Sequence, residues 1–76
     1  MNKIILNKGK DKAAWQLHPW VFSGAISAAL GKPQNGDIVS VYNIEDEFIA
    51  YGIYNGNSRV AVRLLEWDPS QEINEQ

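Results

Sequence analysis

Short apolar segments alternate with polar turns along the chain, and apolar and polar positions alternate most clearly in its second half. Such alternation over four to eight residues is typical of a strand with one buried face. Residues 37–44, 48–54 and 59–67 show this pattern, with polar turns between them at Glu45-Asp46-Glu47 and Asn55-Gly56-Asn57-Ser58. We therefore expect three consecutive strands, the first two joined as a hairpin.

The first half of the chain is less regular. Residues 4–6 are a short apolar run before a polar turn, which predicts a strand. Asp11 can cap a short helix that begins at Lys12, because its carboxylate can accept hydrogen bonds from free N–H groups of the first turn. Pro19 disfavours the α conformation at the residue before it, so this helix should end near Leu17.

The segment 21–26 is rich in β-forming residues and has a central glycine. We expect a strand that bends or bulges at Gly24; alternatively, residues 23–30 form a helix. Residues 31–36 read as a loop, in which Asn35-Gly36 permits positive φ. Several short strands with turns at this spacing predict a mainly β fold with one or two short helices. A small barrel, closed or nearly closed, would remove exposed strand edges.

The composition removes several classes of chemistry. The 76 residues include no cysteine, which excludes disulfides, thiolate metal ligands and a cysteine nucleophile. His18 is the single histidine, so a multi-histidine metal site is excluded as well. The longest stretch without a charged residue, 13–31, contains polar residues and a proline and cannot span a membrane. We expect one soluble, cytoplasmic domain without a signal peptide.

No set of residues with a catalytic pattern stands out. A glycine-rich phosphate loop of the required spacing is missing from the sequence. The acidic cluster Glu45-Asp46-Glu47 is best explained as a charged hairpin tip. We therefore expect no catalytic residue, no metal site and no bound cofactor in this chain.

Charge is unevenly distributed, although the net charge is only −2. Lys8, Lys10 and Lys12 lie near the start, whereas acidic residues collect at the hairpin and in the tail. A local positive region can attract phosphate even in a negative protein. Together with Trp15, these lysines fit a surface that follows a nucleic-acid backbone. The alternative is that both charge clusters are solvated loops.

Two further features suggest nucleic-acid contact. Pro19 can hold His18 and Trp20 at the surface, where flat rings stack on unpaired bases. The alternative, which we favour for Trp20, is that Trp20 and Phe22 belong to the core and that His18 caps its polar edge.

Arg59 and Arg63 form the second feature, since strand spacing puts both side chains on one face, roughly 13 Å apart. An arginine can donate two parallel hydrogen bonds to phosphate oxygens. The alternative is a solvated strand face, or pairing with an acid on a neighbouring strand such as Glu47.

The order of these elements resembles a known family. The resemblance is carried by His18-Pro19-Trp20-Val21-Phe22-Ser23-Gly24-Ala25-Ile26, Gly36-Asp37-Ile38-Val39-Ser40-Val41, Gly52-Ile53-Tyr54-Asn55, Ser58 and Val62-Arg63-Leu64-Leu65. The chain resembles the N-terminal PUA-like domain of bacterial class I methyltransferases that use S-adenosylmethionine to modify cytosine in large-subunit ribosomal RNA. The similarity extends from Lys3 to about residue 73.

The resemblance implies a PUA-like β pseudobarrel with a short helix. Residues 1–70 would be the RNA-binding domain, and residues 71–76 would lead toward a methyltransferase region outside this chain that binds S-adenosylmethionine. The chain would then be an accessory domain rather than an enzyme, with large-subunit ribosomal RNA and that region as its partners. The RNA-binding residues would be Lys8, Lys10, Lys12, Trp15, His18, Arg59 and Arg63.

One departure and one alternative accompany this interpretation. The family commonly has several arginines just before the segment at His18, whereas residues 12–17 hold one cation, Lys12. We therefore expect weak, salt-sensitive RNA binding. The alternative function is a protein-interaction module or homodimer of the same barrel shape, which requires an exposed apolar patch. The patch would consist of Trp15, Trp20 and Tyr54.

Overall fold

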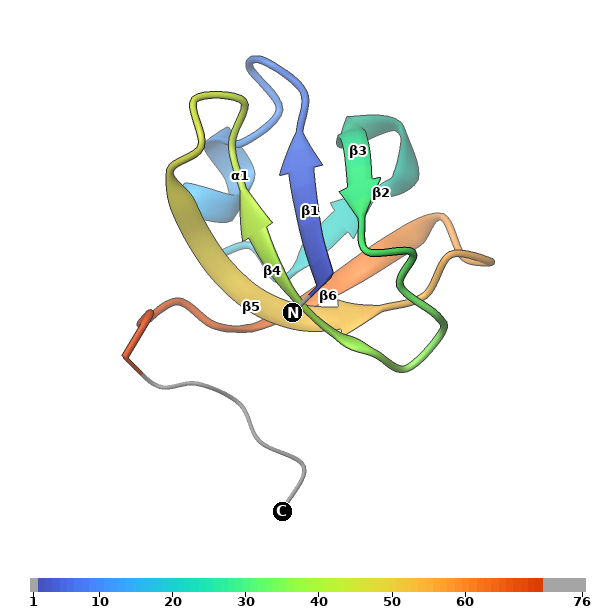
Figure 1. Ribbon diagram of the computed structural model, residues 1–76. Helices are drawn as coiled ribbons and strands as arrows, with labels where there is room; N and C mark the ends of the chain where they lie inside the picture. The colour runs from blue at the N-terminus through green and yellow to red at the C-terminus, as the bar shows by residue number, and fades with distance from the viewer. Residues whose placement is uncertain (1, 71–76) are drawn as a thin grey trace.

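Six β-strands form one sheet in the computed structural model, which describes residues 2–70 (Figure 1). In chain order the elements are β1 (Asn2–Leu6), α1 (Lys12–Trp15), β2 (Trp20–Phe22), the 3-10 turn η1 (Ser23–Ala25), β3 (Ile26–Leu30), β4 (Ile38–Tyr42), β5 (Phe48–Tyr54) and β6 (Val60–Glu66). The strand order is β2-β6-β5-β4-β1-β3. Within residues 2–70, β1 and β4 pair in parallel and the other neighbours are antiparallel.

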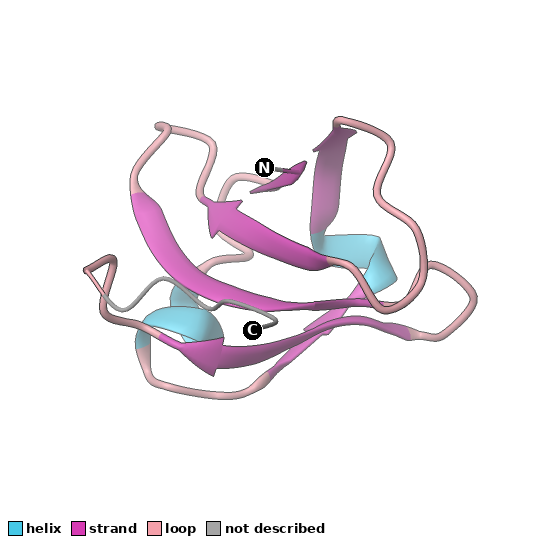
Figure 2. Ribbon diagram, turned by 60° about the horizontal axis from the view of Figure 1, so that its bottom comes forward, coloured by secondary structure: helices cyan, strands magenta, loops and turns pink. Residues whose placement is uncertain are grey.

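The sheet has to curl, because β2 and β3 lie at its opposite edges but follow one another in sequence. A flat sheet of six strands would separate its edge strands by about 24 Å, at about 4.8 Å per step. The four steps from Phe22 to Ile26 reach at most about 14 Å. In Figure 2 the strands accordingly curve round an interior, with the two short helical segments on either side. The expected mainly β, PUA-like pseudobarrel is confirmed.

Irregular pairing supplies the curvature. The register shifts at four of the five strand pairings, so that one strand carries an extra residue at each shift. Such bulges bend a strand and increase its twist. Ile49 is the extra residue between β4 and β5, and both Ile49 and Ala50 are buried, with 1% and 0% exposure. The strict alternation predicted for residues 48–54 therefore fails at this point.

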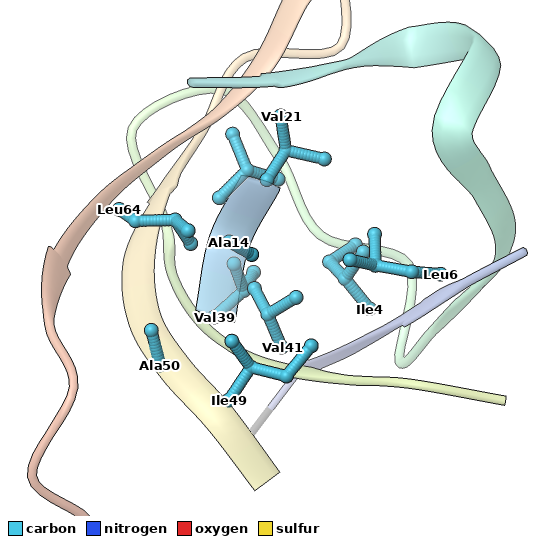
Figure 3. Packing of buried hydrophobic residues seen from close by; sticks show 10 residues of the cluster. Ile4, Leu6, Ala14, Val21, Val39, Val41, Ile49, Ala50 and Leu64 are labelled. Atoms are coloured by element: carbon cyan, nitrogen blue, oxygen red, sulfur yellow. The ribbon is translucent and has the colours of Figure 1, made fainter. Parts of the chain in front are cut away.

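The core fills the concave side of the sheet. Its fully buried large side chains come from β1, β4, β5 and β6: Ile4, Leu6, Val39, Val41, Ile49 and Val62. Figure 3 shows Ala14 of α1 and Val21 of β2 pointing into the same cluster. Trp67, just after β6, donates a hydrogen bond from its indole N–H to the Ala14 carbonyl at 2.8 Å. This bond links α1 to the segment that follows β6.

Most predicted strands are confirmed. β1 is longer than the predicted 4–6, β4 and β6 are shorter than the predicted 37–44 and 59–67, and β5 has the predicted bounds 48–54. The single bent strand expected at 21–26 is wrong. This segment is divided between β2, η1 and the start of β3, and the alternative helix over 23–30 is limited to the one turn of η1. The loop at 31–36 is confirmed, and Gly36 has the expected positive φ of 91°.

Helix α1 begins at Lys12 as predicted, but Asp11 makes no capping hydrogen bond to it. The Asp11 carboxylate accepts instead from the Trp15 indole N–H at 2.8 Å and from the Asn43 amide at 3.3 Å. The helix also ends two residues earlier than expected, at Trp15, because Leu17 turns the chain with a positive φ of 66°.

No helix within residues 2–70 has the length and apolar character needed to cross a membrane. The exit segment predicted for residues 71–76 lies outside the residues that the structure describes.

Candidate nucleic-acid interface

A pocket of about 420 Å³ lies along the outer edge of β2, between α1 and η1. We call it the β2 pocket. Its walls are mostly apolar, and its lining residues, all within the described chain, include no acid. They are Lys10, Ala13, Ala14, His18, Trp20, Val21, Phe22, Gly24 and Ala25. Of the residues predicted to bind RNA, Lys10 and His18 therefore line this pocket.

The end of α1 positions His18. The N–H of Leu17 donates to the Ala14 carbonyl at 3.1 Å, and the N–H of His18 donates to the Ala13 carbonyl at 3.0 Å. These two bonds, with the positive φ of Leu17, form a Schellman closure, in which the residue after the cap is usually glycine. A leucine in this conformation is strained. The chain turns sharply as a result, and His18 is held at the pocket rim.

Trp20 and Phe22 are exposed, at 50% and 51%, whereas Val21 between them is buried at 5%. The burial that we favoured for Trp20, and the alternative core position of Phe22, are therefore wrong. The strand period of two explains the difference, because only one side of β2 faces the core. The His18 ring is exposed and meets Trp20 edge-on, with the ring centres 6.1 Å apart.

The backbone of β2 has an open side. In an antiparallel pair, successive residues point their N–H and C=O groups alternately toward the partner strand and away from it. The Pro19 carbonyl accepts from the Leu64 N–H at 2.6 Å, and the Ser23 N–H donates to the Arg59 carbonyl at 2.8 Å. These bonds bracket β2 and fix the alternation. The residues whose backbone groups point away from β6 are thus Trp20 and Phe22.

His18 satisfies one of these outward groups. The backbone N–H of Trp20 donates to His18 Nδ1 at 3.3 Å. Since Nδ1 accepts, the neutral imidazole carries its hydrogen on Nε2, where it can be donated outward. Phe22 is the N-cap of η1, so its carbonyl accepts the first hydrogen bond of that turn. The open side of β2 therefore presents the carbonyl of Trp20, the N–H of Phe22 and an imidazole N–H.

The two arginines lie at opposite ends of β2. Arg63 is directly opposite Trp20 in the β2–β6 register, and such neighbours share a sheet face. Arg59 lies just before β6, beside Ser23. The premise that both arginines follow one regular strand face does not hold, because a bulge at Ala61 shifts the alternation between them.

Both arginine side chains are exposed. Over residues 2–70 the one ion pair joins Lys3 to Asp46, so neither arginine is paired there with an acid. In particular, Glu47, the alternative partner, accepts a hydrogen bond from the Asn43 amide at 2.8 Å.

The remaining predicted residues do not line the β2 pocket. Lys8 and Lys12 are exposed in the preceding loop and on α1. Trp15 is 46% exposed and bonded to Asp11. The Trp15 indole N–H, which donates to this carboxylate, lowers the pKa of Asp11 below its usual value. Asp11 is thus negative at neutral pH, and it makes the surface beside Trp15 less attractive to phosphate than the surface around β2.

Tyr54 does not join the tryptophans in one exposed apolar patch. It lies opposite Val62, which in turn lies opposite Val21, and it packs against the core. Trp20, one residue before Val21, lies on the other face of β2. The patch required for the alternative protein-interaction function is therefore not formed by these three residues.

Comparison with known protein families decides the relationship, because a model described as a PUA-like domain matches residues 4–67. The chain belongs to the PUA-like domain family. This membership agrees with the observed pseudobarrel and confirms the resemblance in the sequence. The β2 pocket is thus a feature of a PUA-like domain.

Similar proteins with this domain include the ribosomal RNA large subunit methyltransferases I of Serratia proteamaculans and of Escherichia coli. Each is 33% identical to this chain over 72 residues, which is 95% of this chain and 18% of the relative. The PUA-like domain described here therefore spans less than a fifth of the length of these curated relatives.

Proposed function

We propose that this PUA-like domain binds ribosomal RNA and positions it for methylation by a region that lies outside the chain. The observation that carries the proposal is the group of exposed cations around β2. Lys10 lines the β2 pocket, and Arg59 and Arg63 lie at either end of the strand without an acidic partner among residues 2–70. Arginine forks suit phosphate oxygens, and phosphate contacts supply most of the sequence-independent affinity for nucleic acids.

The names of the relatives indicate which class of RNA the domain would bind. They are named as large-subunit ribosomal RNA methyltransferases, and this chain covers 18% of their length. Under the proposal, S-adenosylmethionine and the reacting groups belong to the remainder of such a protein, and the domain described here contributes RNA contact in the cytoplasm. Lys8, Lys12 and Trp15 would add weaker contacts at the α1 side of the same surface.

Titration of a labelled, structured fragment of large-subunit ribosomal RNA tests the proposal. We expect binding at low salt that weakens as salt rises, because released counterions drive it. The double variant Arg59→Ala/Arg63→Ala should bind less tightly. It should also reduce the slope of log affinity against log salt by about 0.7 for each lost contact to single-stranded RNA.

Lys32→Ala is the matched control. Lys32 is exposed in the loop before β4 and does not line the β2 pocket. Its loss should leave both the affinity and the salt slope unchanged. If the domain does not bind at low salt, or if Lys32→Ala weakens binding as much as the arginine variant, the proposal is wrong.

A second candidate function is favoured by other exposed apolar side chains. Leu17 is 63% exposed and Leu65 is 49% exposed. Exposed apolar surface often marks a protein interface. Sedimentation velocity at several concentrations without RNA tests this candidate. A dimer that forms with rising concentration and is weakened by Leu17→Ser would support an interaction module, whereas a monomer throughout would argue against homodimerisation.

A further inference from the structure

We infer that the β2 pocket takes one unpaired nucleobase that is turned out of the RNA stack. This inference rests on the proposed RNA-binding function and adds to it the chemical group that the pocket receives. Phosphate contacts alone would not need a pocket. A concave, mostly apolar cavity with a few polar groups at its edge is the usual form of a site for a small flat ligand.

The size and walls of the pocket fit a base. Its volume of about 420 Å³ lies in the range of pockets for small ligands, about 300–1,000 Å³. Ala13, Ala14 and Ala25 form part of the wall, and these short side chains leave the space open. Buried Val21 provides an apolar surface in the same lining.

Two half-exposed aromatic rings, Trp20 and Phe22, also line the pocket. Stacking on aromatic side chains is the usual way in which proteins hold bases that have left their helix. A soluble domain gains nothing for its own stability by leaving two large rings half in water. Their exposure beside the pocket is explained if a base covers them.

The open side of β2 can satisfy the polar edge of the base. The N–H of Phe22 and the C=O of Trp20 point away from β6, as the alternation fixed by the bonds at Pro19 and Ser23 requires. An adjacent donor and acceptor match the edge of a nucleobase, which also carries a donor beside an acceptor. The Nε2–H of His18 adds one more donor at the rim.

The surrounding charges favour a nucleotide over a peptide. Lys10 lines the pocket, Arg63 lies on the face of Trp20, and no acid is present in the lining. The phosphates on either side of an inserted base would lie near these cations. A peptide added to the edge of β2 as a further strand would gain few backbone hydrogen bonds, since β2 has only 3 residues.

The test compares three RNAs of one length bound to the full 76-residue chain. One has a single-base bulge, one has an abasic site at the bulge, and one is a perfect duplex. We expect the bulged RNA to bind at least about ten-fold tighter than the other two, as loss of one stacked base implies.

Two variants connect this preference to the pocket. Phe22→Ala removes a lining ring, and Leu30→Ala is its control because Leu30 is 50% exposed but does not line the pocket. Gly24→Leu adds bulk at a lining position where a new Cβ meets no atom within 4 Å, so the fold should accept it. We expect Phe22→Ala and Gly24→Leu to abolish the preference for the bulged RNA, and Leu30→Ala to leave it intact.

The outcomes separate this inference from the proposed function. If all three RNAs bind equally and binding still depends on Arg59 and Arg63, RNA binding stands and the base pocket is wrong. If no RNA binds at low salt, both are wrong. If Phe22→Ala and Gly24→Leu disrupt a dimer of the chain and not RNA binding, the pocket holds a segment of a second copy and the inference is overturned.

Discussion

At the scale of single residues, two indole N–H groups make hydrogen bonds of equal length with different consequences. Trp67 donates to the Ala14 carbonyl at 2.8 Å and joins segments 53 positions apart. Trp15 donates to the Asp11 carboxylate at 2.8 Å, only four positions away and in an exposed place. The first bond connects the end of β6 to α1, whereas the second stays within one turn.

Trp67→Phe should therefore destabilise the domain by about 1 kcal/mol, because the hydrogen bond between the end of β6 and the half-buried Ala14 carbonyl is lost, although this carbonyl still accepts from the Leu17 N–H. Trp15→Phe is the control and should change stability by less than about 0.5 kcal/mol, as exposed substitutions usually do. Urea denaturation of both variants measures the difference. Equal losses would show that the Trp67 bond does not contribute specifically.

Asp11 gives the stability of the domain a dependence on pH. Its pKa is lowered, first by the indole N–H of Trp15 and also by the amide of Asn43. A carboxyl group with a folded pKa below its unfolded value of about 3.9 stabilises the fold above that pH. This stabilisation disappears as the pH falls through the folded pKa.

Asp11→Asn keeps an oxygen acceptor and removes the titrating charge. We expect the variant to be less stable than the wild type at neutral pH, and the gap to close as the pH falls below about 3.9. Urea denaturation at a series of pH values measures the gap. A gap of constant size would mean that the Asp11 charge has no stabilising contact in the folded state.

At the scale of elements, the end of α1 is closed by an unfavourable residue. Leu17 occupies the position where a Schellman closure usually has glycine, and its φ is 66°. A left-handed conformation costs a non-glycine residue about 1–2 kcal/mol. The side chain is also 63% exposed, so it recovers little of this energy by packing.

Leu17→Gly should accordingly stabilise the domain by about 0.5–1 kcal/mol, after allowing for the greater freedom of glycine in the unfolded chain. Ala13→Gly is the matched control, since a glycine inside α1 should destabilise by about 1 kcal/mol. Thermal unfolding of the two variants should shift in opposite directions. A lower midpoint for Leu17→Gly would contradict the assigned strain.

The elements also show where prediction from sequence succeeds and where it stops. The strand 48–54 has the predicted bounds, since alternation and flanking turns mark it clearly. Bulges cannot be predicted from the sequence, because one extra residue at Ile49 or Ala61 leaves the local pattern of apolar and polar residues almost unchanged. For this reason the sequence predicts Arg59 and Arg63 on one face, although the bulge between them shifts the alternation. Trp20 was expected to be buried because hydrophobic size alone does not reveal which side of β2 faces the core.

At the scale of the whole molecule, the core is small, and each buried side chain contributes a large share of the free energy of unfolding. A chain of this length has a total stability of about 4–11 kcal/mol, at about 0.05–0.15 kcal/mol per residue. Leu6 is fully buried in the cluster contributed by most of the strands. The loss of one such side chain therefore removes a large part of the total.

Leu6→Ala should destabilise the domain by about 2–5 kcal/mol, through lost apolar burial and the cavity left behind. Leu30→Ala makes the same chemical change at a side chain that is 50% exposed, and it should cost less than about 1 kcal/mol. Circular dichroism during urea denaturation compares the two variants. If their midpoints coincide, the core described here is not the part that holds the sheet together.

The family and the overall fold could be predicted from the sequence. The segment His18-Pro19-Trp20-Val21-Phe22 is characteristic of the family, and the strand pattern that follows it covers most of the remaining chain. The residues that form the surface around β2 could be predicted only in part. Arg63 joins Lys10 and His18 there through the pairing of β2 with the distant β6, which no local pattern encodes.

The position of β6 within the sheet affects how the domain is made. Of the six strands described in residues 2–70, β6 is synthesised last, yet it lies between β5 and β2 and pairs with both. During synthesis, the segment that carries His18 and Phe22 therefore has no β6 to pair with until residues 60–66 have left the ribosome. The side of the domain that carries the β2 pocket is completed last among these strands, so a nascent chain would acquire its fold and its candidate binding surface in the same late step.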